Sequence, residues 1–328
     1  MNKKQGCFDG AVVLVTGGTG SFGKKLIEIV LKEYKPKKLI IYSRDEMKQF
    51  EMQQGYEKDK NVRFFIGDVR DKERLSLAMS GVDYVVHAAA LKIVPSMEYN
   101  PSEAIKTNVL GAMNIIETAL QHKVKKVIAL STDKACNPVN LYGATKLCSD
   151  KLFTAANSYS GLQGTRFAVV RYGNVVGSRG SVVPFFREKM KEGVIPITDK
   201  RMTRFWITLE LGVRFVLKNF ERMHGGEVFV PKIPSMNIMD LKKAVAPDCK
   251  VNFIGIRAGE KLHEVMISAD DARHTVELDD CFVIEPDFNW WDSNNHPRGK
   301  KVKADFYYSS DTNNEWLTIP QLNKMIGA

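Results

Sequence analysis

A glycine-rich turn near the N-terminus, between an apolar run and a helical pattern, constrains the fold of this chain most strongly. The β-branched run Ala11–Val15 is followed by T-G-G-T-G-S-F-G and then by the helical pattern of Lys24–Glu33. Glycines spaced as G-x-x-G-x-x-G let a backbone turn sharply and approach a pyrophosphate, which the helix N-terminus then faces. We therefore predict a dinucleotide-binding unit with contacts from Gly17, Thr19, Gly20, Ser21, Phe22 and Gly23.

Strands and helices are predicted to alternate along the first half of the chain. A long helix is expected to start at Asn100-Pro101 and to run to about His122, because an N-cap residue precedes a proline there. Residues 1–175 are predicted to form a doubly wound, parallel α/β Rossmann domain that carries the catalytic residues. Residues 176–328 are predicted to form mainly a smaller substrate-binding lobe, with some segments able to return to the sheet. The further strands expected are Lys38–Tyr42, Val62–Ile66, Val82–Val86, Val127–Leu130 and Phe167–Tyr172.

The end of the second strand bears on the choice of dinucleotide. Ser43 and Arg44 follow it, with Lys48 one turn on, and these side chains suit the 2′-phosphate of NADP. An acidic residue at that tip would instead hold the free ribose of NAD. NADP is the prediction. The alternative is that Asp45 and Glu46 cap the next helix while Arg44 is solvated, and both can hold at once.

Other strand ends supply the remaining predicted cofactor contacts. His87 is expected to be a core or hydrogen-bonded residue rather than a catalyst. Lys92 is either solvated or near phosphate, and the prediction takes the second reading. The contacts expected here are Asp68, Val69, Ala88, Ala90, Lys92 and Asn108.

The stretch Ser131–Lys146 is the predicted catalytic centre. Thr132, Asp133 and Lys134 should emerge at the carboxyl end of a buried strand, where open α/β sheets bind ligands. Tyr142 and Lys146 fall at i and i+4 on one face of the following helix. A tyrosine that ionises near pH ~10 in water can act as a base at neutral pH if a fixed cation stabilises the phenolate. The alternative is a surface Tyr–Lys pair and a solvated Asp–Lys turn.

Composition places the chain among ordinary proteins without a membrane segment. It has 328 residues, 44% hydrophobic and 26% charged, enough for one large or two unequal domains. No apolar run approaches the ~18 residues of a membrane span, and Met1–Gly10 lacks a signal-peptide core, so we expect a cytoplasmic protein without a membrane partner. The net charge of +10 is spread along the chain, which indicates solvated faces rather than nucleic-acid binding. Five scattered cysteines suggest neither disulfides nor a metal site.

Several motifs together resemble one family. They are T-G-G-T-G-S-F-G, Y-S-R-D-E, F-I-G-D-V-R-D, S-T-D-K-A-C-N-P-V-N-L-Y-G-A-T-K, R-Y-G-N-V-V-G-S-R-G-S-V-V-P-F-F, R-M-T-R-F-W and G-E-K-L-H-E-V-M. In these the chain resembles the extended short-chain dehydrogenase/reductases, and more closely the soluble inverting UDP-N-acetylglucosamine 4,6-dehydratases of pseudaminic acid synthesis. The similarity runs from Val12 to Ile267, with a weaker match at Phe306–Ser310.

The resemblance implies an NADP-dependent lyase that acts on UDP-N-acetylglucosamine. Tyr142, supported by Lys146 and oriented with Thr132, would take the C4 hydroxyl proton as NADP oxidises C4. Lys134 would remove the C5 proton, and Asp133 would assist loss of the C6 hydroxyl. For this Lys134 must be neutral part of the time, which desolvation and neighbouring cations would favour by lowering its pKa. The product would be UDP-2-acetamido-2,6-dideoxy-β-L-arabino-hex-4-ulose, for surface or flagellin glycosylation.

The resemblance also implies a substrate site and an assembly. A homo-oligomer is expected, a hexamer or a dimer. Recurring cations, among them Arg179, are predicted to clasp the anionic substrate. The substrate contacts implied are Lys92, Asn174, Arg204, Arg257 and Glu260.

The sequence departs from the family pattern in two places, and three other functions are considered. Ile93 stands where relatives are expected to have histidine, and Asp287–Pro297 matches nothing in the family. The rivals are a dehydratase that retains the C5 configuration, a UDP-sugar 4-epimerase, and a non-catalytic NADP-sensing module. Asp133-Lys134 argues against simple epimerisation, which needs no acid/base pair for C5 and C6, and an intact Thr132, Tyr142 and Lys146 argues against the sensing module.

Overall fold

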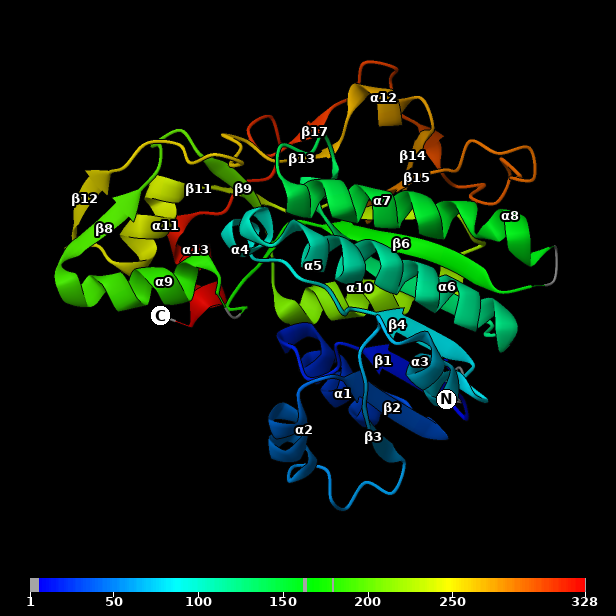
Figure 1. The fold of residues 1–328 in the computed structure, drawn as a ribbon. Helices are drawn as coiled ribbons and strands as arrows, with labels where there is room; N and C mark the ends of the chain where they lie inside the picture. The colour runs from blue at the N-terminus through cyan, green and yellow to red at the C-terminus, as the bar shows by residue number, and fades with distance from the viewer. Residues whose placement is uncertain (1–5, 162–163, 179, 328) are drawn as a thin grey trace, which may run out of the picture.

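A ten-stranded sheet forms the centre of the computed structural model, which describes residues 6–161, 164–178 and 180–327. Helices flank the sheet, and a smaller group of elements lies beside its carboxyl edge (Figure 1). In spatial order the strands are β16 (Lys300–Lys301), β14 (Thr275–Glu277), β15 (Cys281–Ile284), β10 (Val228–Pro231), β6 (Arg166–Tyr172), β5 (Lys126–Thr132), β4 (Tyr84–His87), β1 (Val12–Thr16), β2 (Lys38–Ser43) and β3 (Val62–Ile66).

The sheet is parallel from β3 through β10, which confirms the predicted doubly wound α/β class. Its buried strands read as apolar runs, as expected when helices cover both faces. Strand β15 pairs with β10 in the antiparallel direction, and β14 and β16 continue that way to the edge. These antiparallel strands were not predicted. Because β10, β14, β15 and β16 follow residue 176, part of the second predicted range returns to the sheet, and the division at 175 stays a prediction.

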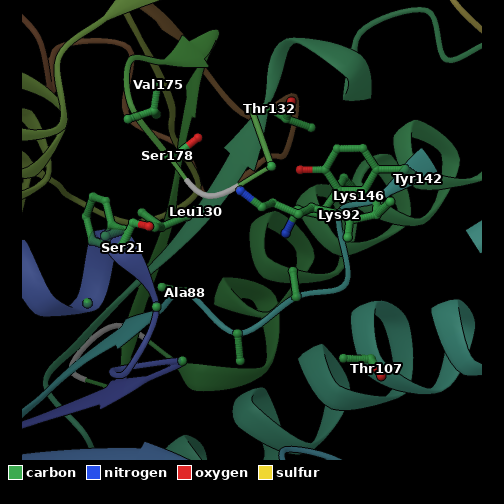
Figure 2. A pocket seen from close by; sticks show the side chains of 18 of the residues that line it. Ser21, Ala88, Lys92, Thr107, Leu130, Thr132, Tyr142, Lys146, Val175 and Ser178 are labelled. Atoms are coloured by element: carbon green, nitrogen blue, oxygen red, sulfur yellow. The ribbon is translucent and has the colours of Figure 1, made fainter. Parts of the chain in front are cut away.

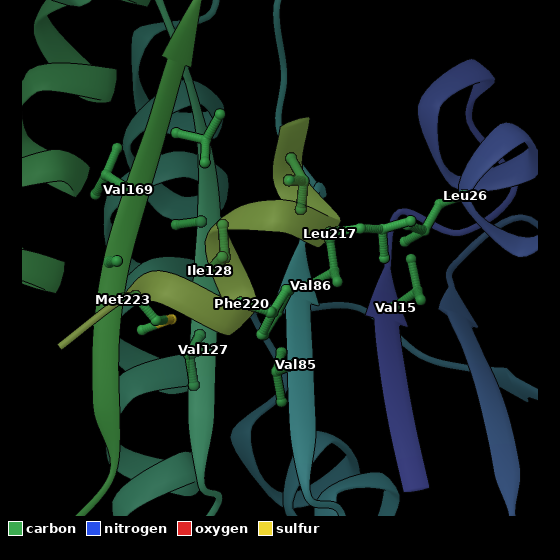
Figure 3. Close-up of a cluster of buried hydrophobic side chains, with 14 of the residues drawn as sticks. Val15, Leu26, Val85, Val86, Val127, Ile128, Val169, Leu217, Phe220 and Met223 are labelled. Carbon is green, nitrogen blue, oxygen red and sulfur yellow. The ribbon is translucent and has the colours of Figure 1, made fainter. Parts of the chain in front are cut away.

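Two layers of helices sandwich the sheet. Helix α1 (Ser21–Glu33) contacts α10 (Leu209–Arg222) in one layer, and α6 (Gly111–Gln121) contacts both α3 (Lys72–Met79) and α7 (Leu141–Ala155) in the other. The apolar side chains of α10 lie across the middle strands (Figure 3), and each such buried side chain contributes roughly 1.5–3 kcal/mol. The residues labelled there include Leu217, Phe220, Met223, Val85, Val86, Val127, Ile128 and Val169.

The long helix predicted from Asn100 to His122 is interrupted. Helix α5 (Pro101–Ile105) passes into a π-helical turn, η1 (Lys106–Leu110), before α6 continues. The extra residue in that turn directs Asn108 inward, where it accepts a hydrogen bond from the Leu91 backbone amide at 2.9 Å and donates to the Leu91 carbonyl at 3.0 Å. Sequence periodicity does not reveal this interruption because the partner, Leu91, lies in a distant loop.

A smaller set of elements, here called the C-terminal lobe, packs around Trp206 and forms its own apolar cluster. It lies beside the sheet (left in Figure 1). Its elements are α9 (Val182–Lys189), η3 (Met190–Glu192), β8 (Val194–Ile197), β9 (Thr203–Ile207), β11 (Ser235–Asn237), α11 (Ile238–Val245), β12 (Lys250–Phe253) and α13 (Ile319–Ile326). The elements not yet named are α2 (Glu46–Gln53), α4 (Val94–Tyr99), η2 (Asp133–Ala135), α8 (Asn157–Ser160), β7 (Asn174–Val175), β13 (Val265–Ile267), α12 (Ala269–Ala272) and β17 (Tyr308–Ser309).

The segment Asp287–Pro297, which matched no motif of the family in the sequence, packs against the end of the sheet opposite the cavity. The Trp290 indole donates to Ser158 Oγ at 2.9 Å and stacks on Phe288 with ring centroids 5.4 Å apart. His296 Nε2 lies 3.5 Å from the buried Glu227 carboxylate. The segment is thus a structural cover over the start of β10, remote from the carboxyl edge.

Gly23 provides a test of this packing. A Cβ there would lie 2.5 Å from the Cα of Gly18, whereas a Cβ at Gly212 in α10 would meet only Ile207 Cδ1, at 3.9 Å. We expect Gly23→Ala to lower the free energy of unfolding by about 1–3 kcal/mol through overpacking. Gly212→Ala should raise it by about 0.5–1 kcal/mol, because glycine is unfavourable inside a helix. Urea unfolding checks both, and equal midpoints for the two variants would contradict this view of the turn.

Candidate active site

A cavity of about 830 Å³ opens at the carboxyl edge of the sheet, where β1, β2, β4, β5 and β6 end. Figure 2 shows Thr132, Tyr142 and Lys146 grouped on one side of it, across from Ser21. Most of the predicted site residues line it. These are Gly17, Thr19, Gly20, Ser21, Phe22, Gly23, Ser43, Arg44, Lys48, Asp68, Val69, Ala88, Ala90, Lys92, Thr132, Asp133, Lys134, Tyr142, Lys146 and Asn174.

The glycine turn forms a cradle at the floor of the cavity. Gly17 has φ +66°, and a Cβ there would lie 2.9 Å from the backbone of Ala88, so only glycine fits. Helix α1 begins after Gly20 with no capping side chain and no acidic residue in its first turn. Its N-terminal amides are therefore available to an anion, and the dipole favours negative charge there. These features fit the pyrophosphate of a dinucleotide.

The structure shows the cap expected at the end of the second strand, and the choice between NADP and NAD stays a prediction. The Asp45 carboxylate accepts from the Lys48 backbone amide at 3.0 Å, so it caps α2, and it also pairs with the Lys48 ammonium. Arg44 lines the cavity with its side chain 54% exposed, and its Nη1 is 3.6 Å from Asp68 Oδ2. Its guanidinium is therefore at the surface of the cavity and able to receive a phosphate.

The five predicted catalytic side chains converge where β5 ends. The Thr132 hydroxyl donates to Asp133 Oδ1 at 2.9 Å, and the Lys134 ammonium donates to the same oxygen at 3.0 Å. Helix α7 brings Tyr142 and Lys146 to the same cavity, with Lys146 buried. Two proton-transferring groups, a phenol beside a lysine and a carboxylate beside a lysine, thus share one space.

Burial dominates the protonation of the tyrosine pair. It raises the pKa of Tyr142 to about 12, although the Lys134 charge and a hydrogen bond with Thr132 act in the opposite direction. Burial lowers the pKa of Lys146, and the nearby Asp150 carboxylate opposes that shift. His87, by contrast, shares a 2.8 Å hydrogen bond with Thr16, and burial holds its pKa at about 3. It is neutral and structural, as the sequence predicted.

Lys134 departs from the sequence-based expectation. Desolvation and neighbouring cations were expected to favour the neutral amine, and burial and Arg204 do act that way. The carboxylates of Asp133 and Glu264 outweigh them, so the pKa of Lys134 is raised and the side chain is an ammonium. The prediction of a lowered pKa is therefore wrong. Asp133 raises the pKa of Lys134 most, and Glu264, 3.3 Å from Lys134 Nζ, adds to it. Sequence reasoning missed Glu264 because it follows β12, far along the chain.

Four predicted contacts lie outside the lining of the cavity. Asn108 holds the Leu91 backbone and Thr145. Arg204 donates to the carbonyls of Thr203, Lys261 and Leu262, so its guanidinium holds a loop instead of facing the cavity. These two side chains serve packing in this structure.

Arg257 and Glu260 are the other two predicted contacts that do not line the cavity. The Arg257 guanidinium is largely exposed and lies 4.0 Å from the Glu260 carboxylate, on the loop beside Asn140. Arg179 lies outside the described residues.

The unpredicted lining includes Tyr172, Thr107 and Ile93, the last with its side chain exposed. Their only sequence signal was position, next to strand ends or within the helix that η1 interrupts.

No helix in the described part of the chain is both long and apolar enough to cross a lipid bilayer.

Comparisons with known proteins agree with the fold. The UDP-N-acetylglucosamine 4,6-dehydratase (inverting) of Campylobacter jejuni serotype O:2 is 60% identical over 96% of this chain and 96% of its own. A UDP-glucose 4-epimerase of Rickettsia canadensis is 43% identical over 84% and 83%. The X-ray structure of Pen from Bacillus thuringiensis superimposes with a TM-score of 0.89 at 39% identity, covering 98% of both chains.

The matched family is described as polysaccharide biosynthesis protein, and the match spans residues 13–286. That range contains the glycine turn, the Ser131–Lys146 stretch and Glu264. The predicted resemblance to extended short-chain dehydrogenase/reductases, and to the inverting dehydratases among them, is confirmed. This chain therefore belongs to the polysaccharide biosynthesis protein family, as a relative of the inverting UDP-N-acetylglucosamine 4,6-dehydratase of C. jejuni.

Proposed function

We propose that this protein is an inverting UDP-N-acetylglucosamine 4,6-dehydratase with NADP as its cofactor. The observation that carries the proposal is the pair Asp133–Lys134, joined at 3.0 Å, in the same cavity as Tyr142 and Lys146. Loss of water from C5 and C6 needs a base and an acid in addition to the group that serves C4. The 60% identity to the C. jejuni enzyme supports the same assignment.

The cofactor end of the cavity suits NADP. When bound there, the nicotinamide dinucleotide supplies a reversible electron-pair acceptor for C4. Gly17 and the start of α1 would hold the pyrophosphate, and Arg44 would meet the 2′-phosphate. Asp68 and Val69, which line the cavity beyond β3, would contact the adenine.

The first proton transfer belongs to Tyr142. Its phenolate would take the C4 hydroxyl proton as C4 becomes a ketone, with the buried Lys146 ammonium and the Thr132 hydroxyl stabilising the anion. Burial raises the pKa of Tyr142 to about 12, and the Lys134 charge and the hydrogen bond with Thr132 act against that shift. The ketone then acidifies the proton on C5.

The second step belongs to Asp133 and Lys134. If the Lys134 ammonium passes one proton to the carboxylate 3.0 Å away, the amine becomes a base and the carboxyl becomes an acid in a single transfer. The amine takes the C5 proton, and the acid protonates the departing C6 hydroxyl, which leaves as water. C6 then recovers the electron pair taken from C4, and C5 is reprotonated on the opposite face. The balance is loss of one water, with no net oxidation.

A second candidate function is UDP-sugar 4-epimerisation, which the R. canadensis relative carries in its name. That reaction inverts C4 through the same ketone and needs no acid or base at C5 and C6. The Asp133–Lys134 pair would then have no chemical task.

Turnover in deuterated water separates these functions. We expect the purified protein, given UDP-N-acetylglucosamine and NADP, to release a product with a C6 methyl group, deuterium at C5 and the L-arabino configuration, all visible by NMR. A 4-epimer without deuterium would overturn the dehydratase assignment. Retention at C5 would overturn only the inverting assignment.

Lys134→Ala should remove dehydration while leaving the cofactor site intact, because Lys134 is the proposed base for the C5 proton. We expect 4-keto-6-deoxy product to fall by at least about 10²-fold, typical for loss of a general base. NADP retention should match the wild type in a filtration assay. The control is Lys243→Ala, a surface lysine paired with Asp240 at 3.3 Å, which should turn over normally. Full activity of Lys134→Ala would remove the lysine from the mechanism.

Arg44→Ala tests the choice of dinucleotide. A hydrogen bond to a charged group contributes about 1.5–3 kcal/mol, so the Kd for NADP should rise roughly ten-fold or more, and that for NAD about two-fold at most. Calorimetry or fluorescence titration measures both. An equal loss for the two dinucleotides would refute the assignment of Arg44 to the 2′-phosphate.

A further inference from the structure

Glu264 is a buried carboxylate that reaches the catalytic cluster from the far part of the chain. Its Oε1 lies 3.3 Å from Lys134 Nζ and 3.7 Å from Arg204 Nε, and its Oε2 lies 3.9 Å from Lys261 Nζ. Its backbone is fixed on both sides by Ser310, whose hydroxyl accepts from the Glu264 amide at 2.9 Å and whose amide donates to the Glu264 carbonyl at 2.8 Å. The carboxylate is therefore held in place and has no access to bulk solvent.

Lys134 thus has a carboxylate on each of two sides. Asp133 contacts Nζ from η2, Glu264 contacts it from the segment before β13, Arg204 approaches from β9, and the Tyr142 phenol from α7. Burying a charge is costly unless it is paired. The buried Glu264 carboxylate therefore favours the charged form of its neighbour Lys134. None of the steps assigned above to Asp133, Lys134 and Tyr142 uses Glu264.

We propose that Glu264 is a positioning residue of the dehydration step, which holds Lys134 against Asp133 so that the pair keeps its one shared proton far into the alkaline range. The inference rests on the proposed dehydratase function. Asp133 can protonate the C6 hydroxyl only while the pair still holds that proton. Once it is lost to solvent, the amine remains a base but no acid is left for the departing hydroxyl.

The sign of the effect follows from the charges. A second carboxylate near Nζ makes removal of the shared proton harder, in agreement with the raised pKa of Lys134, where burial is outweighed by Asp133 and Glu264. Neutralising Glu264 should therefore move the alkaline loss of activity to lower pH. Neutralising a cation on its other side, Lys261, should move that loss to higher pH.

The experiment is the pH profile of kcat for release of the C6-methyl product, from pH 6 to the limit of stability, with NADP-loaded protein. For Glu264→Gln we expect the alkaline limb to move down by about one pH unit or more, the usual effect of removing one charge within ~4–6 Å. The matched control is Asp270→Asn, which removes an exposed carboxylate paired with Arg273 and should leave the limb unmoved. A uniform loss at every pH, with an unmoved limb, would make Glu264 merely structural and overturn the proposal.

Lys261→Gln supplies a second, independent arm in case Glu264→Gln does not fold, as judged by NADP retention and Tm. Lys261 donates to the Cys136 carbonyl at 2.6 Å, a bond that glutamine can replace, so the folded variant should show the alkaline limb at higher pH or beyond the measurable range. An alkaline limb at lower pH than in the wild type would overturn the proposal. Where the wild-type limb can be measured, an unchanged limb would overturn it as well. Failure of the proposed function looks different: the wild type itself would then release no C6-methyl product.

Discussion

The parallel strands of the sheet impose the constraint on which the site depends: their carboxyl ends all meet at one edge. Residues that follow β1, β2, β4 and β5 therefore face one cavity, although some of them lie more than a hundred residues apart in the sequence. The glycine cradle after β1 and the Thr132–Lys134 group after β5 occupy the two ends of that cavity. The proposed cofactor and sugar sites thus share one cavity.

Local chemistry made much of this predictable. Within the glycine turn Gly23 meets Gly18, and Gly17 meets the backbone of Ala88 after β4, the strand that pairs with β1. Tyr142 and Lys146 share a helix face because of the helical period. The position of Arg44 at the edge of the cavity, directly after β2, is local in the same sense. Each of these depends on residues close in sequence, or on the parallel order that alternation of strands and helices implies.

The unpredicted features all depend on long-range contacts. In the π turn η1, Asn108 bonds to the backbone of the distant Leu91. The antiparallel strands β14 to β16 join the sheet only after the chain has returned to β10. Glu264 could not be assigned to Lys134 from sequence because 130 positions separate them. Arg204 shows the opposite error: an arginine expected at phosphate spends its donors on backbone carbonyls. A positively charged side chain indicates which groups a residue can bind, but the fold decides which group it contacts.

Arg171, buried at the end of β6, explains how so distant a residue as Glu264 is held to this accuracy. Its Nη1 donates to the Met266 carbonyl at 2.9 Å, two residues beyond Glu264, while its Nη2 lies 3.4 Å from the Asp150 carboxylate on α7. Asp150 in turn accepts from the Ser131 hydroxyl at 2.8 Å, next to Thr132. A buried ion cluster of this kind adds little net stability, because desolvation offsets the attraction between the charges. The cluster instead fixes the relative positions of β6, α7 and the segment that carries Glu264. If one of them shifted, a buried charge would lose its partner, so the cluster also fixes the distances around Lys134.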